Sequence, residues 1–236
     1  MRVVTHQKLV NRNVKIGEYA SGAGLLLLIG AFGLNIYSLT QTPDPRTMTY
    51  VFLAFIVGFT CTNVGLYFRN RWGRRPDRGL AEALKGLDER FTLYNYRLGA
   101  AHVLIGPSGS MVFVPKYQGG AIAYAGGKWI NPGGPRGFAR FFATDSLGNP
   151  TAEAGDEAEI FKRFIKKHAP EINVEPQAVI VFMHPRAEIS AKDSPIPVVH
   201  VKQFKDYVRR FSKGSPLPAA ALAGLEEKLG LKRQDL

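Results

Sequence analysis

Few side chains in this sequence have the types and spacing that chemistry requires. Three histidines, His102, His184 and His200, lie in or beside apolar segments that are far apart in the sequence. Histidines that a fold brings together can bind a metal ion, but core or strand-end histidines are commoner, so we expect no metal site. Ser108 and Ser110 have no evident histidine–acid constellation, and their Gly-Pro-Ser-Gly context is typical of a turn rather than a nucleophile elbow.

Lys116 and Trp129 are the other residues that could contact a ligand. Lys116 follows an apolar segment and could bind a phosphate group, although a solvated lysine at a strand end is the simpler interpretation. Trp129 and three phenylalanines could form a binding surface, pack a loop against the sheet, or lie at a membrane interface. These phenylalanines are Phe138, Phe141 and Phe142.

Two long apolar segments determine where any such chemistry takes place. They run from about Tyr19 to Leu39 and from about Met48 to Phe68, and neither contains Asp, Glu, Lys or Arg. Each has the ~20 residues that a helix needs to cross the hydrocarbon of a bilayer. The alternatives are a pair of buried core helices and, for the first segment, a cleaved signal peptide. The sequence shows no convincing small-residue cleavage site, so we expect a transmembrane helical hairpin.

Charge on the flanks orients this hairpin. Arg2, Lys8, Arg12 and Lys15 precede the first span, whereas the connecting loop 40–47 carries only Asp44 and Arg46. Five arginines follow the second span and would attract anionic lipid: Arg69, Arg71, Arg74, Arg75 and Arg78. Because basic residues accumulate on the cytoplasmic side, we expect both termini and the soluble domain to be cytoplasmic.

Small residues predict how the two spans pack. The second span has a small-residue face formed by Ala54, Gly58, Cys61, Thr62 and Gly65. The first span offers Gly22, Gly24, Gly30 and Gly33 as its counterpart, and a partner protein is the alternative. Asn35 and Asn63 could form a hydrogen bond across the pair. No Asp, Glu, Lys, Arg or His lies in either span, so nothing indicates a proton or ion path.

The remaining sequence predicts one α/β domain in a reducing compartment. The chain has 236 residues, a net charge of +12 and a single cysteine, Cys61, which rules out a disulfide or zinc framework within one chain. We expect helices over 80–90, 153–168, 202–211 and 217–231, and an irregular segment over 131–150. Strands are expected over 91–96, 102–105, 111–117, 121–124, 128–130, 178–183 and 197–201. This order predicts an α/β sandwich around a mixed sheet.

Several short motifs in this region resemble the nuclease-related domain family, NERD. They are Gly79-Leu80-Ala81-Glu82, the runs HVLIGPSG from His102 and VFVPK from Val112, Gly126-Gly127-Lys128-Trp129, and Asn149-Pro150. The resemblance covers residues 79–211. It implies a restriction-endonuclease-like α/β fold with a mixed sheet and a metal-dependent nuclease site.

Two ligand positions of that family site have no ligand here. Where the family pattern has an Asp before the strand histidine, this chain has Ala101, and where it has a Glu two residues before the strand lysine, it has Val114. Lys116 and Glu82 match the pattern, and Glu153 replaces a glutamine. Because magnesium needs several oxygen ligands, the resemblance implies a degenerate site with no bound metal.

We therefore expect a membrane-anchored, non-catalytic NERD-like binding or accessory module, such as a subunit of a membrane protein complex. Its segments are a cytoplasmic N-terminal segment 1–18, the hairpin 19–68, a basic linker 69–78, the domain 79–211, and a linker and helix 212–236. The expected partners are the membrane, anionic lipid and other membrane subunits, with no cofactor. The alternative is a membrane-tethered nuclease or nucleic-acid-binding protein that uses Lys116, Lys128, Arg136 and Arg140.

Overall fold

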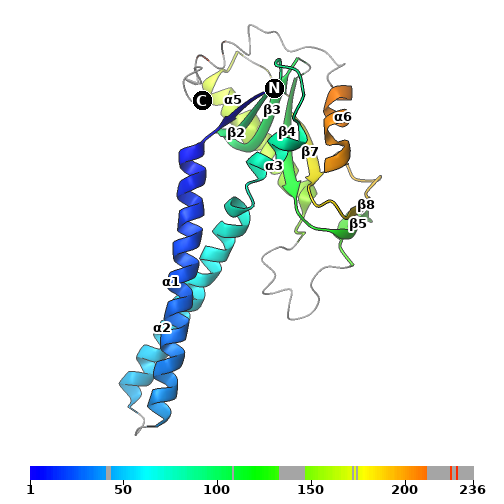
Figure 1. Ribbon diagram of the computed structural model, residues 1–236. Helices are drawn as coiled ribbons and strands as arrows, with labels where there is room; N and C mark the ends of the chain where they lie inside the picture. The colour runs from blue at the N-terminus through cyan, green and yellow to red at the C-terminus, as the bar shows by residue number, and fades with distance from the viewer. Residues whose placement is uncertain are drawn as a thin grey trace. The chain divides into compact units, whose positions relative to one another are not determined.

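The computed structural model describes residues 1–236 except 41–43, 108, 133–146, 172, 174, 212–223, 225–226 and 228–236. The chain forms two compact units, Gln7–Arg75 and Met1–His6 with Pro76–Leu236 (Figure 1). Most of the predicted irregular segment 131–150 and of the predicted last helix 217–231 lies outside the described residues.

The first unit is a helical hairpin. Helix α1 spans Gln7–Leu39, helix α2 spans Pro45–Phe68, and a short π-helix, η1, continues α2 over Arg69–Gly73. Asp44 caps α2 by accepting a hydrogen bond from the Arg46 backbone N–H. Pro45 occupies the first helical position, where a backbone N–H would have no partner within the helix. Helix α1 begins at Gln7, well before Tyr19, so it includes most of the predicted N-terminal segment 1–18.

Small residues allow α1 and α2 to approach closely, as predicted. A Cβ atom at Gly24 would collide with Thr62, and one at Gly65 would collide with Ser21. A Cβ at Gly58 would lie 3.0 Å from Leu28 Cγ. The packing thus uses the small-residue face of α2 within the chain.

The prediction for the α1 side was only partly right. A Cβ atom added at Gly22, Gly30 or Gly33 would have no neighbour within 4 Å outside its own helix. These three glycines therefore lie outside the α1–α2 contact. Asn63 is exposed and donates to the Phe59 carbonyl of its own helix, so the predicted bond across the pair is wrong for this residue. Which small or polar residues of a helix face the other helix depends on how the helix is rotated about its axis, and the composition of the segment does not give this rotation.

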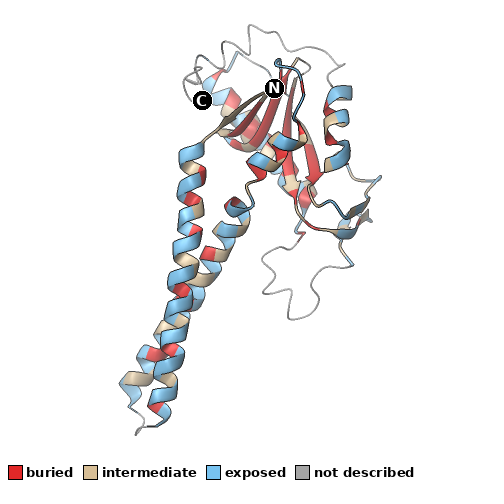
Figure 2. Ribbon diagram, in the orientation of Figure 1, coloured by how far each residue is buried: buried red, intermediate tan, exposed pale blue. Residues whose placement is uncertain are grey.

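The outward faces of the hairpin are apolar. Leu26 is 72% exposed and Phe52 is 66% exposed, and most residues of both helices are exposed (Figure 2). In the most apolar stretch of each helix only 17% of the residues are buried within the structure. Both helices are long and apolar enough to span a membrane, and their exposure is unlike that of core helices in a soluble protein.

A six-stranded mixed sheet forms the centre of the second unit. Its strands, in spatial order, are β1 (Arg2–Thr5), β2 (Thr92–Leu98), β3 (Ala100–Gly106), β4 (Gly109–Lys116), β7 (Gln177–Phe182) and β9 (Val198–His200). The pairs β1–β2, β4–β7 and β7–β9 are parallel, and β2–β3 and β3–β4 are antiparallel. The predicted mixed α/β class is confirmed. Strand β1 was not predicted, because only its pairing with the distant β2 makes it a strand.

A smaller sheet has the order β6-β5-β8, with β5 at Gly120–Ala125, β6 at Lys128–Ile130 and β8 at Ala187–Ser190. The predicted hairpin between β5 and β6 is confirmed. Gly126 and Gly127 form its turn with φ angles of 56° and 76°, a backbone that favours glycine.

Helices cover both faces of the large sheet. Helices α3 (Pro76–Ala83) and α6 (Val201–Phe211) pack on the face that carries Phe113 of β4, whereas α5 (Pro150–His168) packs on the face that carries Val112. Period-two alternation along β4 divides its side chains between the two cores. Helix α3 ends at Ala83, short of the predicted end at residue 90, and Gly86 in the following turn has a φ of 81°.

Candidate functional site

Lys116, the residue that could bind a phosphate, is held inside the protein. It lies at the end of β4 and is only 8% exposed, so the interpretation as a solvated lysine was wrong. Its Nζ donates to both carboxylate oxygens of Glu153 at 2.7 Å and to the Leu147 carbonyl at 3.1 Å. These three acceptors match the three hydrogens of an ammonium group.

The start of α5 positions Glu153. Asn149 caps this helix by accepting from the Ala152 backbone, and Pro150 follows at the first helical position. A carboxylate in the first turn of a helix is favoured by the exposed N–H groups there. Trp129 of β6 donates from Nε1 to Thr151 Oγ1 at 2.7 Å and packs beside Phe182, so it serves the domain core.

The two positions without a ligand side chain both lie close to α5. The backbone N–H of Ala101 donates to Glu157 Oε2 at 2.7 Å. Val114 is 6% exposed and belongs to an apolar cluster with Ala154 and Ile180. A methyl group and an isopropyl group therefore occupy the two positions at which the resemblance implied a lost metal ligand.

Glu82 does not join Lys116. Helix α3 packs through Leu80 on the Phe113 face of the sheet, whereas Lys116 reaches α5 on the opposite face. The Glu82 side chain is 76% exposed and lies 3.6 Å from Lys85 Nζ. The structure thus separates Glu82 from Lys116, the two residues that the resemblance implied for one site. In the part of the chain that the structure describes, no group of three His, Cys, Asp or Glu residues could hold a metal ion.

The three histidines serve structural roles in two separate places. The buried His102 is 2.8 Å from Asn95 Oδ1 through Nδ1, and the Asn95 amide donates to Thr5 Oγ1 at 3.0 Å, which ties β1, β2 and β3 together. His200 Nδ1 accepts a hydrogen bond from the Lys202 backbone N–H at 3.2 Å, and its Nε2 lies 3.1 Å from the His184 carbonyl oxygen. The predicted core and strand-end roles account for these contacts.

Basic side chains gather at one end of the hairpin. Residue Gly17 of α1 lies beside η1, because a Cβ there would be 2.9 Å from the Arg69 backbone nitrogen. The start of α1 therefore runs alongside η1, although the two segments are far apart in the sequence. We call the six exposed cations at this end the basic collar: Lys8, Arg12, Lys15, Arg69, Arg71 and Arg74. Glu18 is the only acid in residues 7–18 and 69–75.

The basic collar lies next to the apolar surface of the hairpin. Arg69 directly follows the second apolar segment, and Lys15 lies four residues before the first. Lys8 lies about 10 Å further along α1 than Lys15, at ~1.5 Å per residue. This distance between Lys8 and Lys15 is about one Debye length at physiological salt, so all the α1 cations can interact with charge at a membrane surface. Of the other two predicted lipid-facing arginines, Arg75 is partly buried with a φ of 49°, and Arg78 is exposed on α3 in the second unit.

The aromatic and basic residues predicted in the irregular segment lie outside the described residues. They are Arg136, Phe138, Arg140, Phe141 and Phe142. No protein-family model, no curated protein and no solved structure matches this chain, so its function is argued from the residues and geometry above.

Proposed function

We propose that this protein is a membrane-anchored, non-catalytic binding or accessory module whose NERD-like α/β domain stands at the cytoplasmic face of the membrane. In this role it is a subunit of a membrane protein complex and contacts anionic lipid. The observation that carries the proposal is the basic collar at one end of an exposed, apolar helical hairpin. Such a surface matches the boundary between hydrocarbon and anionic headgroups.

The sheet supports a hairpin topology. Strand β1 precedes α1 and pairs with β2, which follows α2. An open sheet such as this one cannot extend across a bilayer, because lipid offers no hydrogen-bond partners for the backbone groups at its edges. If α1 and α2 span the membrane, the segments before and after them are on the same side, and the positive-inside rule assigns that side to the cytoplasm.

The Lys116–Glu153 pair supports the absence of catalysis. A lysine that assists phosphodiester hydrolysis must approach the attacking water or the phosphate. Here all three ammonium hydrogens have acceptors within the protein. Ala101 and Val114 add no oxygen ligand for a metal ion.

One observation favours the alternative, a membrane-tethered nuclease or nucleic-acid-binding protein. Glu153 and Glu157 are one turn apart on α5, and they lie beside Lys116 and Ala101 respectively. Two carboxylates therefore stand near the positions that lost their ligands. Each of them already accepts a hydrogen bond from the protein, which is why we prefer the non-catalytic role.

Purification from native membranes tests the proposal. The full-length protein is extracted with a mild nonionic detergent, and the co-purifying proteins, lipids and nucleic acids are quantified. We expect stoichiometric membrane subunits and enrichment of anionic lipid. Recovery of DNA or RNA without membrane subunits would support the alternative instead.

A matched pair of variants isolates the role of the basic collar. Replacing Lys15, Arg69 and Arg71 by Gln should remove most of the lipid enrichment. Replacing Arg163, Lys166 and Lys167, three exposed cations of α5, by Gln changes the net charge equally and should leave the enrichment unchanged. Full-length protein is required, because a fragment that begins after the hairpin lacks strand β1.

A further inference from the structure

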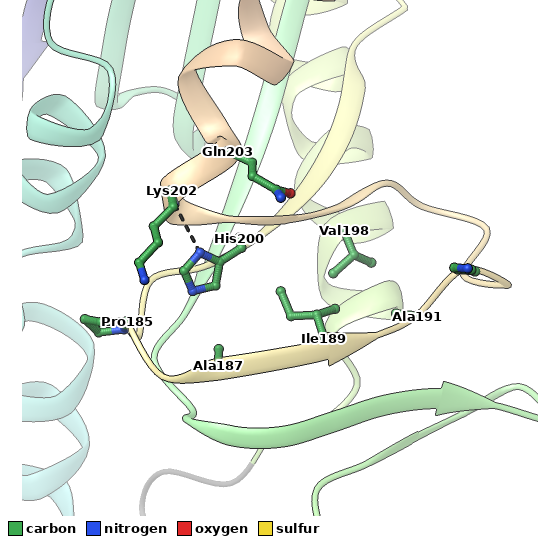
Figure 3. Close-up of a pocket in the computed structure, with 9 residues that line it drawn as sticks. Pro185, Ala187, Ile189, Ala191, Val198, His200, Lys202 and Gln203 are labelled. Atoms are coloured by element: carbon green, nitrogen blue, oxygen red, sulfur yellow. Dashed lines mark hydrogen bonds between the residues drawn. The ribbon is translucent and has the colours of Figure 1, made fainter.

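A groove beside the last strand of the large sheet has no role in the function proposed above. One hollow of about 420 Å³ lies between β8, β9 and the start of α6 (Figure 3). A second hollow of about 310 Å³ continues it toward the end of α6. The two hollows share Ala191, Lys192, Val198 and Gln203, so we treat them as one feature, the β8–β9 groove.

The groove is positively charged. Lys202 lines the first hollow, Arg210 lines the second, and Lys192 lines both. No acidic residue is among the described residues that line either hollow. None of the three cations forms an ion pair with another residue that the structure describes. Their charges are therefore available to an anionic ligand.

Apolar side chains form the floor. Figure 3 shows Ala187 and Ile189 of β8 on one side, facing Val198 and His200 of β9 on the other. Ile189 and Val198 also pack against the apolar cluster that contains Phe182. A ligand that fits this groove thus combines negative charge with apolar groups.

The groove also follows a sheet edge. Among the described residues, strand β9 pairs only with β7 and is the last strand of its sheet. Val199 of β9 faces the core under α6, whereas Val198 belongs to the core toward β8. Side chains of an added strand would alternate in the same way, with one set toward α6 and the other toward β8. Main-chain hydrogen bonding at a free edge is a recurring mode of peptide recognition.

From these three features we infer that the β8–β9 groove binds an extended peptide of a partner protein in which acidic and apolar side chains alternate. The peptide adds a strand to β9, its acidic side chains meet Lys192, Lys202 and Arg210, and its apolar side chains cover Ile189 and Val198. A charge-complementary rim of this kind sets specificity and association rate more than affinity. The inference does not depend on the membrane anchor.

A binding assay with the full-length protein in nanodiscs of neutral phosphatidylcholine tests this inference. The probe is a fluorescein-labelled octapeptide of alternating Glu and Val, followed by fluorescence anisotropy. We expect saturable binding that the Lys192→Gln/Lys202→Gln variant weakens by about fivefold or more. Lys202→Gln alone should also weaken binding, and Lys205→Gln is its matched control, because Lys205 lies on the same helix but its ammonium is next to Gly86, away from the groove. This control should bind like the unmodified protein.

Three further probes separate the possible ligands. The same peptide with Lys in place of Glu should not bind, and a version with N-methylated alternate amides should bind at least tenfold more weakly because it cannot pair with β9. An octathymidylate should not compete. The inference would be overturned if the Glu–Val peptide does not bind, or if the Lys205→Gln control loses as much affinity as the groove variant. It would also be overturned if the N-methylated peptide binds undiminished or if the oligonucleotide competes.

Discussion

Glu153 of α5 holds the ammonium group of Lys116 of β4 with both of its carboxylate oxygens, each 2.7 Å from Nζ. Lys116 is almost completely buried, whereas the Glu153 side chain is 48% exposed. This pair joins the end of a central strand to the first turn of the helix that covers it. Lys116 therefore joins the sheet to the helix that covers it.

Removing the charge of Glu153 should destabilise the domain, because it leaves a buried ammonium group without its anion. We expect Glu153→Gln to lower the free energy of unfolding by about 1–2 kcal/mol, less than for a fully buried pair because Glu153 is half exposed. Asp156→Asn, an exposed position on the same helix, should change it by less than ~0.5 kcal/mol. Chemical unfolding in detergent measures both, and equal effects would contradict the structural role.

The purified protein should not cleave DNA or RNA in the presence of magnesium or manganese. Ala101 and Val114 cannot bind a cation, and Glu82 lies on the other face of the sheet from Lys116. A gel-based cleavage assay checks this. Cleavage that disappears in Lys116→Ala or Glu82→Ala would refute the prediction. The Ala101→Asp/Val114→Glu variant is the complementary test, since it introduces the two carboxylates that the proposed resemblance to NERD implies for an active site.

Gly24 and Gly30 should differ sharply in their tolerance of a larger side chain. A Cβ at Gly24 would collide with Thr62 of α2, whereas one at Gly30 meets nothing within 4 Å. We expect Gly24→Leu to destabilise the hairpin by about 1–3 kcal/mol through overpacking. Gly30→Leu should be tolerated. Thermal unfolding in the same detergent compares them, and similar melting temperatures for the two variants would show that the helices pack differently.

Strand β1 should stabilise the domain through a buried polar network. Asn95 is fully buried, and its amide donates to Thr5 Oγ1 while its carbonyl oxygen lies 2.8 Å from His102 Nδ1. Thr5→Val keeps the shape of the side chain but removes the acceptor, so we expect a loss of about 1–3 kcal/mol. Thr5→Ser retains the hydroxyl and should lose much less. If the two variants unfold alike, the network does not hold β1.

Local patterns in the sequence predicted the elements that carry strong signals of their own. The apolar run at Ala178–Met183 predicted β7, and Gly126-Gly127 predicted the turn between β5 and β6. Strands β1 and β8 have four residues each and pair with β2 and β5, which are distant in the sequence. Such short segments become strands through their neighbours, so no local pattern reveals them.

The candidate sites were likewise predictable where a local sequence pattern marks them, and not where they form between distant parts of the chain. The sequence placed Lys116 at a strand end but could not reveal Glu153 as its partner, because the two residues meet only when α5 packs on the sheet. The basic flanks were evident in the sequence, but the alignment of α1 with η1 that makes them one collar depends on the close contact at Gly17. The β8–β9 groove had no sequence signal, since it forms between an unpredicted strand and a sheet edge.

The transmembrane topology is the central claim, and cysteine labelling tests it most directly. In a Cys61→Ala background, Thr40→Cys marks the connecting loop and Glu82→Cys marks the domain, and both positions are exposed. Intact cells in which the membrane that holds the protein is accessible from outside are treated with a membrane-impermeant maleimide. We predict that the cysteine at 40 is labelled, and that the cysteine at 82 is labelled only after the membrane is opened. Labelling of position 82 in intact cells, or of neither position until the membrane is opened, would contradict a cytoplasmic domain on a spanning hairpin.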